Sequence, residues 1–242
     1  MPLIEKNLHS DFSPSVLNPF FFIRKGLKAG VEKYASNLTG KMMDFGCGTK
    51  PYRSLFQVEE YIGVDFENPG HPHDNEQIDI FYDGLTIPLP DGYFDSVLSS
   101  EVFEHIFNLD HVLRELNRVM KPGGKLLVTC PFVWNEHEVP YDYARYTRFA
   151  LADILKRNGF EIMEFSKTGN FVTATYQLWI LYWYHLLYPR TKKIAILRWI
   201  YKIFFVFFLN LLGIFSNIIL PKQYSFYLNN VVLAQKSSVV NK

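Results

Sequence analysis

The stretch KMMDFGCGT, residues 41–49, decides how this chain folds. Residues 41–45 are mostly apolar and predict a short buried strand, and Gly46 and Gly48 follow at once, where the backbone must turn and admit a ligand closely. A second apolar segment, YIGVD at 61–65, ends in Asp65. A glycine-rich turn after one strand and an acid at the end of the next are typical of the ligand-binding edge of an α/β sheet.

Strand-like and helix-like patterns alternate from Lys41 to about residue 170. Further strands are expected at 78–82, 94–99, 124–132, 160–165 and within 224–236, and a KPGG turn at 121–124. Amphipathic segments at 109–120 and 147–160 predict helices between them. Such alternation predicts an α/β, doubly wound, Rossmann-like and mostly parallel sheet with helices on both faces.

Composition divides the 242 residues into four parts. They are an N-terminal helical segment (1–40), a central domain (41–170), an aromatic, basic helical insertion (171–221), and the last strand with a tail (222–242). The length fits one large domain with an insertion. Helical spacing after Pro19 predicts a docking helix, and a membrane-touching Phe20–Phe22 patch is the alternative.

The net charge of +1 conceals an uneven distribution. All 24 acidic residues lie at or before Glu164, whereas nine of the 25 basic residues follow it. Within the insertion, 171–188 and 203–220 lack Asp, Glu, Lys and Arg, and basic residues lie between them. We expect this segment to lie in the surface of an anionic membrane; a lid, a dimer interface and a spanning hairpin stay open. Nucleic-acid binding is not expected, because the positive charges are sparse.

Four segments together carry a family resemblance: MMDFGCGT, YIGVDF, IPLPDGYFDSVLSSEVFEHI and RELNRVMKPGGKLLVTCPF. In their order and spacing the chain resembles class I S-adenosylmethionine-dependent methyltransferases, of the broad group called type 11. The resemblance covers about 41–170 with 224–236, and it implies S-adenosylmethionine as cofactor and an antiparallel last strand.

The resemblance also implies cofactor-binding residues. Asp44 is expected to support the amino-acid end of the cofactor and Asp65 to hold the ribose, while Asp83 resembles the acid that meets the adenine amine. The remaining residues expected to line the cofactor are Gly46, Cys47, Gly48, Phe66, Ser100 and Glu101.

One position departs from the family pattern. The family often has a third glycine where this chain has Lys50, and Pro51 follows, so the first helix is expected to be truncated. The dinucleotide fingerprint G-x-G-x-x-G would need a glycine at Pro51, which argues against a nicotinamide-dependent dehydrogenase.

Two histidines are candidate general bases. His137 lies in the polar, aromatic stretch 134–147 after the expected fifth strand, and His105 lies in EVFEHI. The spacing of Glu101, Glu104 and His105 would place them on one face of a helix, so a metal-assisted reaction is an alternative. The expectation is nevertheless that no metal is bound.

Taken together, the sequence predicts O-methylation of a small or lipid-linked acceptor, such as a glycan intermediate or a quinone. A membrane-associated binding protein that keeps the cofactor fold without turnover is the alternative. No signal peptide is apparent, and two cysteines favour a reducing setting, so the expected location is cytoplasmic, peripheral on the inner face of the membrane. The sequence indicates neither the oligomeric state nor the acceptor.

Overall fold

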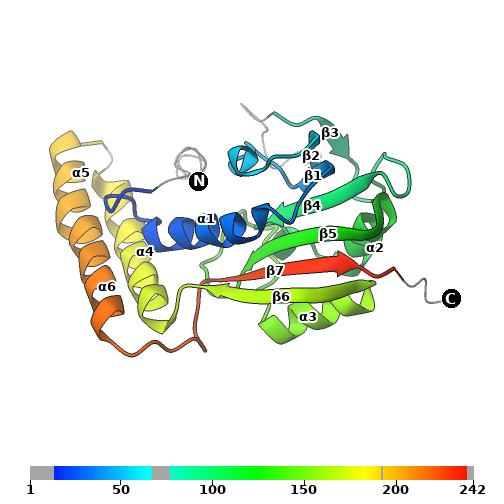
Figure 1. Cartoon of the computed structure of the whole chain (residues 1–242). Helices are drawn as coiled ribbons and strands as arrows, with labels where there is room; N and C mark the ends of the chain where they lie inside the picture. Colours follow the sequence, from blue (N-terminus) through cyan, green and yellow to red (C-terminus); the bar gives the residue numbers. More distant parts are fainter. Residues whose placement is uncertain (1–13, 67–76, 192, 239–242) are drawn as a thin grey trace. The chain divides into compact units, whose positions relative to one another are not determined.

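The computed structural model describes residues 14–66, 77–191 and 193–238, and it contains one seven-stranded sheet (Figure 1). The strand order is β3-β2-β1-β4-β5-β7-β6. The strands are β1 (Lys41–Phe45), β2 (Glu60–Phe66), β3 (Ile80–Tyr82), β4 (Phe94–Ser100), β5 (Met120–Pro131), β6 (Phe160–Thr168) and β7 (Asn229–Lys236).

Strand directions confirm the predicted topology. β1 pairs in parallel with β2 and β4, β2 with β3, and β4 with β5. β7 runs antiparallel to β6, since Leu228 N–H donates to Thr168 O and Ser237 N–H donates to Gly159 O at opposite ends of the pair. The chain order reverses between β1 and β4, which is where open α/β sheets bind their ligands.

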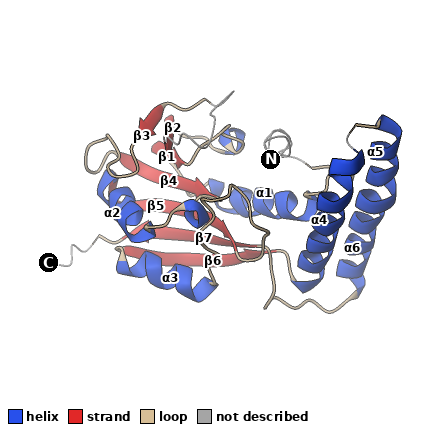
Figure 2. Ribbon diagram, turned by 180° about the vertical axis from the view of Figure 1, so that it is seen from behind, coloured by secondary structure: helices blue, strands red, loops and turns tan. Residues whose placement is uncertain are grey.

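Alternate side chains of the strands enter two separate cores. In β1, Met42 packs into a core with the C-terminal half of α1 (Phe21–Ala35), whereas Met43 packs against α2 (Leu109–Val119) and α3 (Arg148–Arg157). The two-residue period of a strand produces this division. Figure 2 shows α2 and α3 covering one face of the sheet. The expected helices on both faces are thereby confirmed.

Two local features bear on the sequence predictions: one differs from its prediction and the other agrees with it. The KPGG segment at 121–124 does not separate helix from strand, because β5 begins at Met120 and runs through it. The register shifts between Phe94 and Ser96, and Gly123 takes a positive φ of 78°, so the glycines form an irregularity inside the strand. The first crossover helix is reduced to one 3-10 turn, Arg53–Leu55, as expected from the short loop after Gly48.

The chain forms two compact units. One comprises Met1–Ala29 and Lys167–Asn229, and the other comprises Gly30–Ser166 and Asn230–Lys242. The second unit holds most of the sheet with α2 and α3.

The first unit is mostly helical. It contains α4 (Phe171–Thr191), α5 (Ala195–Tyr201), a π-helical segment (Lys202–Phe207) and α6 (Phe208–Ile219). The last three form a helix of 25 residues, Ala195–Ile219, that is long and apolar enough to cross a membrane. Only 17% of its most apolar stretch of 18 residues is buried within the structure. The wide π turn keeps Tyr201 and Val206, five residues apart, buried with Asn210 and Gly213.

Within this unit, a buried amide side chain on α4 holds the beginning of α1. Gln177 on α4 accepts hydrogen bonds from the N–H groups of Phe22 and Ile23 and donates to Pro19 O. These N–H groups lie in the first turn of α1, where a helix offers no partner. Phe20, Phe21 and Phe22 are all less than 9% exposed. The docking interpretation of this segment therefore agrees with the structure.

Replacing Gln177 tests this cap. The Gln177→Ala variant leaves two helix-start N–H groups without their acceptor, and each such loss costs about 1–3 kcal/mol. We expect the amides of Phe22 and Ile23 to exchange with deuterium at least tenfold faster. Thr175→Ala, an exposed change on the same helix, is the control. Equal exchange rates in both variants would contradict the cap.

Candidate functional site

The loop after β1 folds back onto the end of β2. Gly46 and Gly48 take positive φ angles of 71° and 44°, which favour glycine. Gly46 N–H donates to Val64 O at 2.8 Å, and Gly48 N–H donates to Asp65 Oδ2 at 2.9 Å. The predicted glycines and the predicted ribose acid therefore lie together.

Backbone N–H groups orient the Asp65 carboxylate. Its Oδ1 accepts the N–H of Phe66 at 2.8 Å, and its Oδ2 accepts that of Gly48. These two backbone bonds, one to each oxygen, hold the carboxylate in one orientation. The arrangement suits a ligand that presents neighbouring hydroxyl groups.

Asp44 is a buried acid behind this loop. Only 3% of the residue is exposed, and Tyr61 Oη donates a very short hydrogen bond to Asp44 Oδ2. Burial, opposed by the Tyr61 bond, raises the pKa of Asp44 to about 7. Burial also raises the pKa of the Cys47 thiol, so Cys47 is a packing residue here rather than a nucleophile.

Lys50 occupies the position where the family pattern has a third glycine. It takes the left-handed conformation, with φ of 53°, that a glycine would adopt easily. Its Nζ lies 2.6 Å from Asp79 Oδ2, and the same oxygen accepts Gly63 N–H at 2.6 Å. A Cβ at Gly63 would lie 2.3 Å from Lys50 Cε. No motif marks Asp79 in the sequence: it falls within 78–82, which was expected to be a strand, whereas β3 begins only at Ile80.

Asp83 and Phe66 lie at the β2–β3 side of the site. Asp83 Oδ1 accepts the N–H groups of Leu85 and Thr86, which lowers the pKa of Asp83 and closes a turn. The Phe66 and Tyr82 rings meet edge to face, with centroids 5.7 Å apart. The contact of Asp83 with an adenine amine stays a prediction.

The turn after β4 touches the glycine loop. A Cβ on Gly46 would lie 2.3 Å from Val102 Cγ2, so only glycine permits this approach. Thr129 on β5 donates to Glu101 Oε1 at 2.9 Å, and its oxygen lies 2.8 Å from Ser100 Oγ. Thr129 has one hydroxyl proton, so Ser100 donates in that pair. Ser100 and Glu101 thus lie next to the glycine loop.

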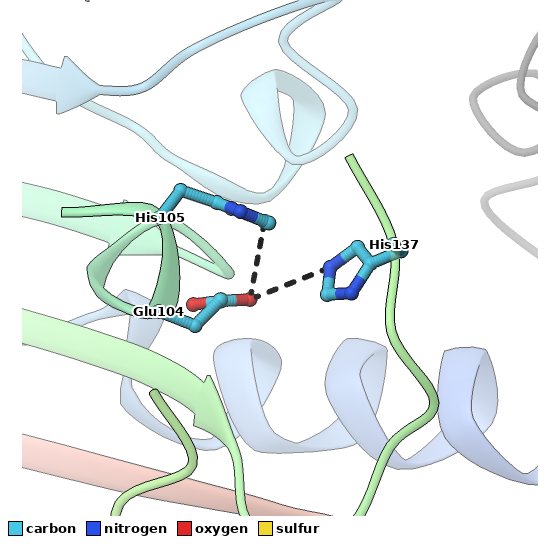
Figure 3. Close-up of side chains that lie close together, drawn as sticks. All are labelled: Glu104, His105 and His137. Carbon is cyan, nitrogen blue, oxygen red and sulfur yellow. Dashed lines mark ion pairs between the residues drawn. The ribbon is translucent and has the colours of Figure 1, made fainter. Parts of the chain in front are cut away.

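A polar cluster follows directly on this turn (Figure 3). Glu104 and His105 lie on the 3-10 turn Phe103–His105, and His137 lies on the loop after β5. Glu104 Oε1 is 3.8 Å from His105 Nε2 and 4.0 Å from His137 Nε2. The two imidazole rings meet edge to face, with centroids 4.6 Å apart. The structure therefore brings both candidate bases to one carboxylate.

His137 is held by its own loop. Its N–H donates to Asp142 Oδ2, and its Nδ1 lies 3.4 Å from the same oxygen. Arg145 binds both oxygens of Asp142, at 2.5 and 2.7 Å. Burial, followed by the neighbouring His105, lowers the pKa of His137, so its ring is neutral near pH 7.

The glycine loop contains one polar atom suited to a ligand. The Thr49 hydroxyl is buried and has no hydrogen-bond partner among the described residues. With the ordered Asp65 carboxylate and the two glycines, it offers the polar groups that an amino-acid and ribose cofactor requires. The residues present therefore fit S-adenosylmethionine.

Comparison with known proteins gives one family. Residues 43–128 match the model of the methyltransferase domain. A Mycolicibacterium smegmatis protein named "Probable S-adenosylmethionine-dependent methyltransferase" is 26% identical over 147 residues, 58% of this chain and 55% of that protein. A Caulobacter ubiquinone/menaquinone biosynthesis C-methyltransferase is 37% identical over 68 residues, 28% of this chain and 26% of that protein. The chain thus spans about half the length of the first relative and about a quarter of the second.

Solved structures share the fold. A SAM-dependent methyltransferase from Archaeoglobus fulgidus superposes with a TM-score of 0.54 at 19% identity, covering 88% of this chain and 94% of that one. Haemonchus contortus phosphoethanolamine N-methyltransferase 2, in complex with S-adenosyl-L-methionine, gives 0.52 at 18% identity, covering 88% and 52%.

Asp44 predicts an unusual pH dependence. The native pKa of about 7 lies above the unfolded value of 3.8, so the folded state binds the extra proton between these values. Stability from this group is therefore full below pH 4 and lost as pH rises through 7. Relative to wild type, Asp44→Asn is expected to gain up to about 4 kcal/mol between pH 4 and 8. Urea unfolding across this range measures the difference.

Asp83→Asn is the control for this titration. Its native pKa is lowered, so removing that carboxylate is expected to produce no gain in stability with rising pH. A stability difference between Asp44→Asn and wild type that stays constant with pH would refute the assignment to Asp44.

Proposed function

This chain carries a methyltransferase domain of the class I S-adenosylmethionine-dependent type, and from that premise we propose that it methylates an oxygen atom of a small or lipid-linked acceptor. The observation that carries the proposal is the meeting of two features at the β1–β4 edge. The glycine loop adjoins the turn after β4 through Gly46 and Val102. The cluster of buried Glu104 with half-buried His105 and His137 begins two residues beyond Val102.

The chain's own residues divide the work of holding the cofactor. Asp65, ordered by two backbone N–H groups, would bind the ribose hydroxyls, and Asp44 with Thr49 would support the amino-acid end. Ser100 and Glu101 would flank the methionine part. The bound cofactor supplies an electrophilic methyl group on a sulfonium. Positioning against the acceptor then provides much of the rate.

The acceptor oxygen is assigned to the cluster side of the site. The acceptor oxygen forms its bond to the methyl carbon while the carbon–sulfur bond breaks and its electron pair stays on sulfur. The hydroxyl proton passes to the cluster, where His137 and His105 are the candidate bases. His137 is suited to this role because it is neutral and its Nδ1 faces Asp142.

Carbon methylation of a quinol-type ring is the second candidate reaction. The observation in its favour is the partial similarity to proteins named ubiquinone/menaquinone biosynthesis C-methyltransferase. Such a ring also loses a proton during methylation, so the same cluster would serve. Product analysis with a labelled methyl group separates an ether from a new carbon–carbon bond.

The helical unit supports a membrane-presented acceptor. Apolar side chains that are at least 39% exposed gather on α4, α5 and α6 and the residues beside them: Phe171, Trp179, Tyr182, Ile194, Ile196, Leu197, Trp199, Ile200, Phe204, Phe208, Leu211, Leu212, Phe215, Ile218, Ile219 and Leu220. Arg198 and Lys202 lie among them, and the unit has no acidic residue after Lys167. Such a surface suits an anionic lipid interface, so we assign the protein to the cytoplasmic face of a membrane.

Cofactor binding is tested by calorimetry with S-adenosylmethionine. Asp65→Ala removes two carboxylate acceptors from the ribose, each worth about 1.5–3 kcal/mol, so affinity is expected to fall at least tenfold. Asp153→Asn on the exposed face of α3 is the control and is expected to bind as wild type. Absence of heat for the wild-type protein at millimolar cofactor would overturn the proposal.

Membrane association is tested with phosphatidylglycerol vesicles against phosphatidylcholine vesicles. Trp199→Glu and Phe215→Glu place charge within the exposed apolar face, and each is expected to lower partition at least tenfold. Phe149→Glu, at an exposed aromatic on α3, is the control. Binding to anionic vesicles is expected to weaken at high salt. Wild-type protein that stays in buffer at low salt would contradict the assignment.

A further inference from the structure

The Glu104 carboxylate is buried in an energetically unfavourable environment. Glu104 is 0% exposed, and neither of its carboxylate oxygens has a hydrogen-bond partner among the described residues. Burying a charge costs several kcal/mol unless it is paired or binds a metal. Burial, and secondly the Glu101 charge, raise the pKa of Glu104 well above its usual range. A group kept under such conditions needs a compensating partner.

Two imidazole nitrogens face this carboxylate. Oε1 of Glu104 and the Nε2 atoms of His105 and His137 belong to a group whose ligand atoms all lie within 4.8 Å of one another. Ligands that share one ion at about 2.1 Å lie about 3–3.5 Å apart, so a side-chain shift of about 1 Å closes the set. Figure 3 shows the three side chains converging from two segments of the chain.

The outer nitrogens are arranged as they are in metal sites. His105 Nδ1 lies 2.8 Å from Tyr141 O, which fixes its proton there and leaves the Nε2 lone pair facing Glu104. His137 Nδ1 lies 3.3 Å from Asn135 O and 3.4 Å from Asp142 Oδ2. A carbonyl or carboxylate behind each imidazole is the usual support of a metal-binding histidine. His105 therefore directs a lone pair at Glu104. Arg145 Nη2 also lies 3.4 Å from His137 Nδ1, so His137 directs its Nε2 lone pair at the same point in the tautomer whose Nδ1 proton faces Asn135 O or Asp142 Oδ2.

We propose that Glu104, His105 and His137 bind one divalent transition-metal ion at the acceptor side of the site. Two imidazoles and a carboxylate suit zinc, iron(II) or manganese(II), rather than magnesium or calcium. Glu138 Oε2, 3.7 Å from His105 Nε2, is near enough to join the set or to take a proton. Three protein ligands leave a position open for the acceptor oxygen.

A bound ion would act as a Lewis acid on the acceptor oxygen, and this role rests on the proposed function. With the ion bound, His105 and His137 are ligands and no longer bases. The ion binds the acceptor oxygen and lowers its pKa, and the released proton passes to Glu138 or to water. Oxygen–carbon bond formation and carbon–sulfur bond cleavage are unchanged, so the step remains balanced without an oxidant or reductant.

The metal-binding alternative expected from the sequence used a different set of ligands. Glu101, Glu104 and His105 would share a face only on an α-helix, but the chain here forms a 3-10 turn from Phe103 to His105, preceded by Glu101 at φ of 57°. Glu101 Oε1 instead accepts the Thr129 hydroxyl. His137 takes the third place, and 32 residues separate it from His105, so spacing alone does not reveal it.

Metal binding is measured on the full chain without cofactor, with zinc chloride and manganese chloride as probes. After stripping with a chelator and dialysis, we expect one ion per chain by elemental analysis and a higher unfolding temperature with metal. Glu104→Gln and His137→Ala are each expected to weaken binding at least tenfold. His111→Ala, a histidine outside the cluster, is the control and is expected to bind as wild type.

The outcomes separate this inference from the proposed function. Less than a tenth of an ion per chain, or equal affinity in wild type and Glu104→Gln, overturns the metal site. Glu104→Gln keeps the shape of the buried side chain, so this variant is expected to fold. Calorimetry with S-adenosylmethionine checks that the variant still binds the cofactor as wild type does. A wild-type protein that binds the ion at this cluster but no cofactor would preserve the metal site and overturn the proposed function.

Discussion

The contact between Gly46 and Val102 is the constraint on which the site depends. The backbone of the loop after β1 passes so close to the turn after β4 that no Cβ fits at Gly46. Parallel pairing of β1 with β4 brings the two carboxyl ends to one edge, and the glycine removes the last steric barrier between the loops. The cofactor loop and the chain leading to Glu104 are adjacent for this reason.

Two carboxylates at this edge of the sheet have contrasting environments. On the glycine side, Asp65 is an acceptor oriented by backbone N–H groups, as a neutral polyol ligand requires. On the other side, Glu104 has no hydrogen-bond donor among the residues that the structure describes, and it faces two imidazole rings. The first arrangement is complete without an ion. The second is compensated only when a proton or a cation lies between its members.

The sequence predicted the fold well because the fold follows from local rules. Alternation of apolar residues in short strands, amphipathic spacing at 109–120 and the glycines after β1 are short-range signals. The ends of elements were less predictable: the KPGG segment reads as a turn but is absorbed in β5 as an irregularity. Pairing with β4 outweighs the local preference of the glycines.

The site was predictable only where residues adjoin strands. Asp44, Gly46, Gly48 and Asp65 were expected near one another from their positions at the ends of strands, and the structure places Gly48 against Asp65; their contacts with the cofactor stay predictions. Asp79 and the union of His137 with Glu104 depend on loops whose path is set by tertiary packing, so no spacing indicates them. The helical unit showed its composition in the sequence, but the exposure of its apolar side chains becomes visible only once the helices are packed.

We propose that one edge of the sheet binds the methyl donor beside a polar cluster that receives the acceptor. A crystal structure with S-adenosylhomocysteine tests it most directly. Ligand density is expected across the ends of β1 and β2, with the ribose on Asp65 and the sulfur directed toward Glu104, His105 and His137. Ligand density elsewhere on the protein, or a sulfur directed away from this cluster, would contradict it.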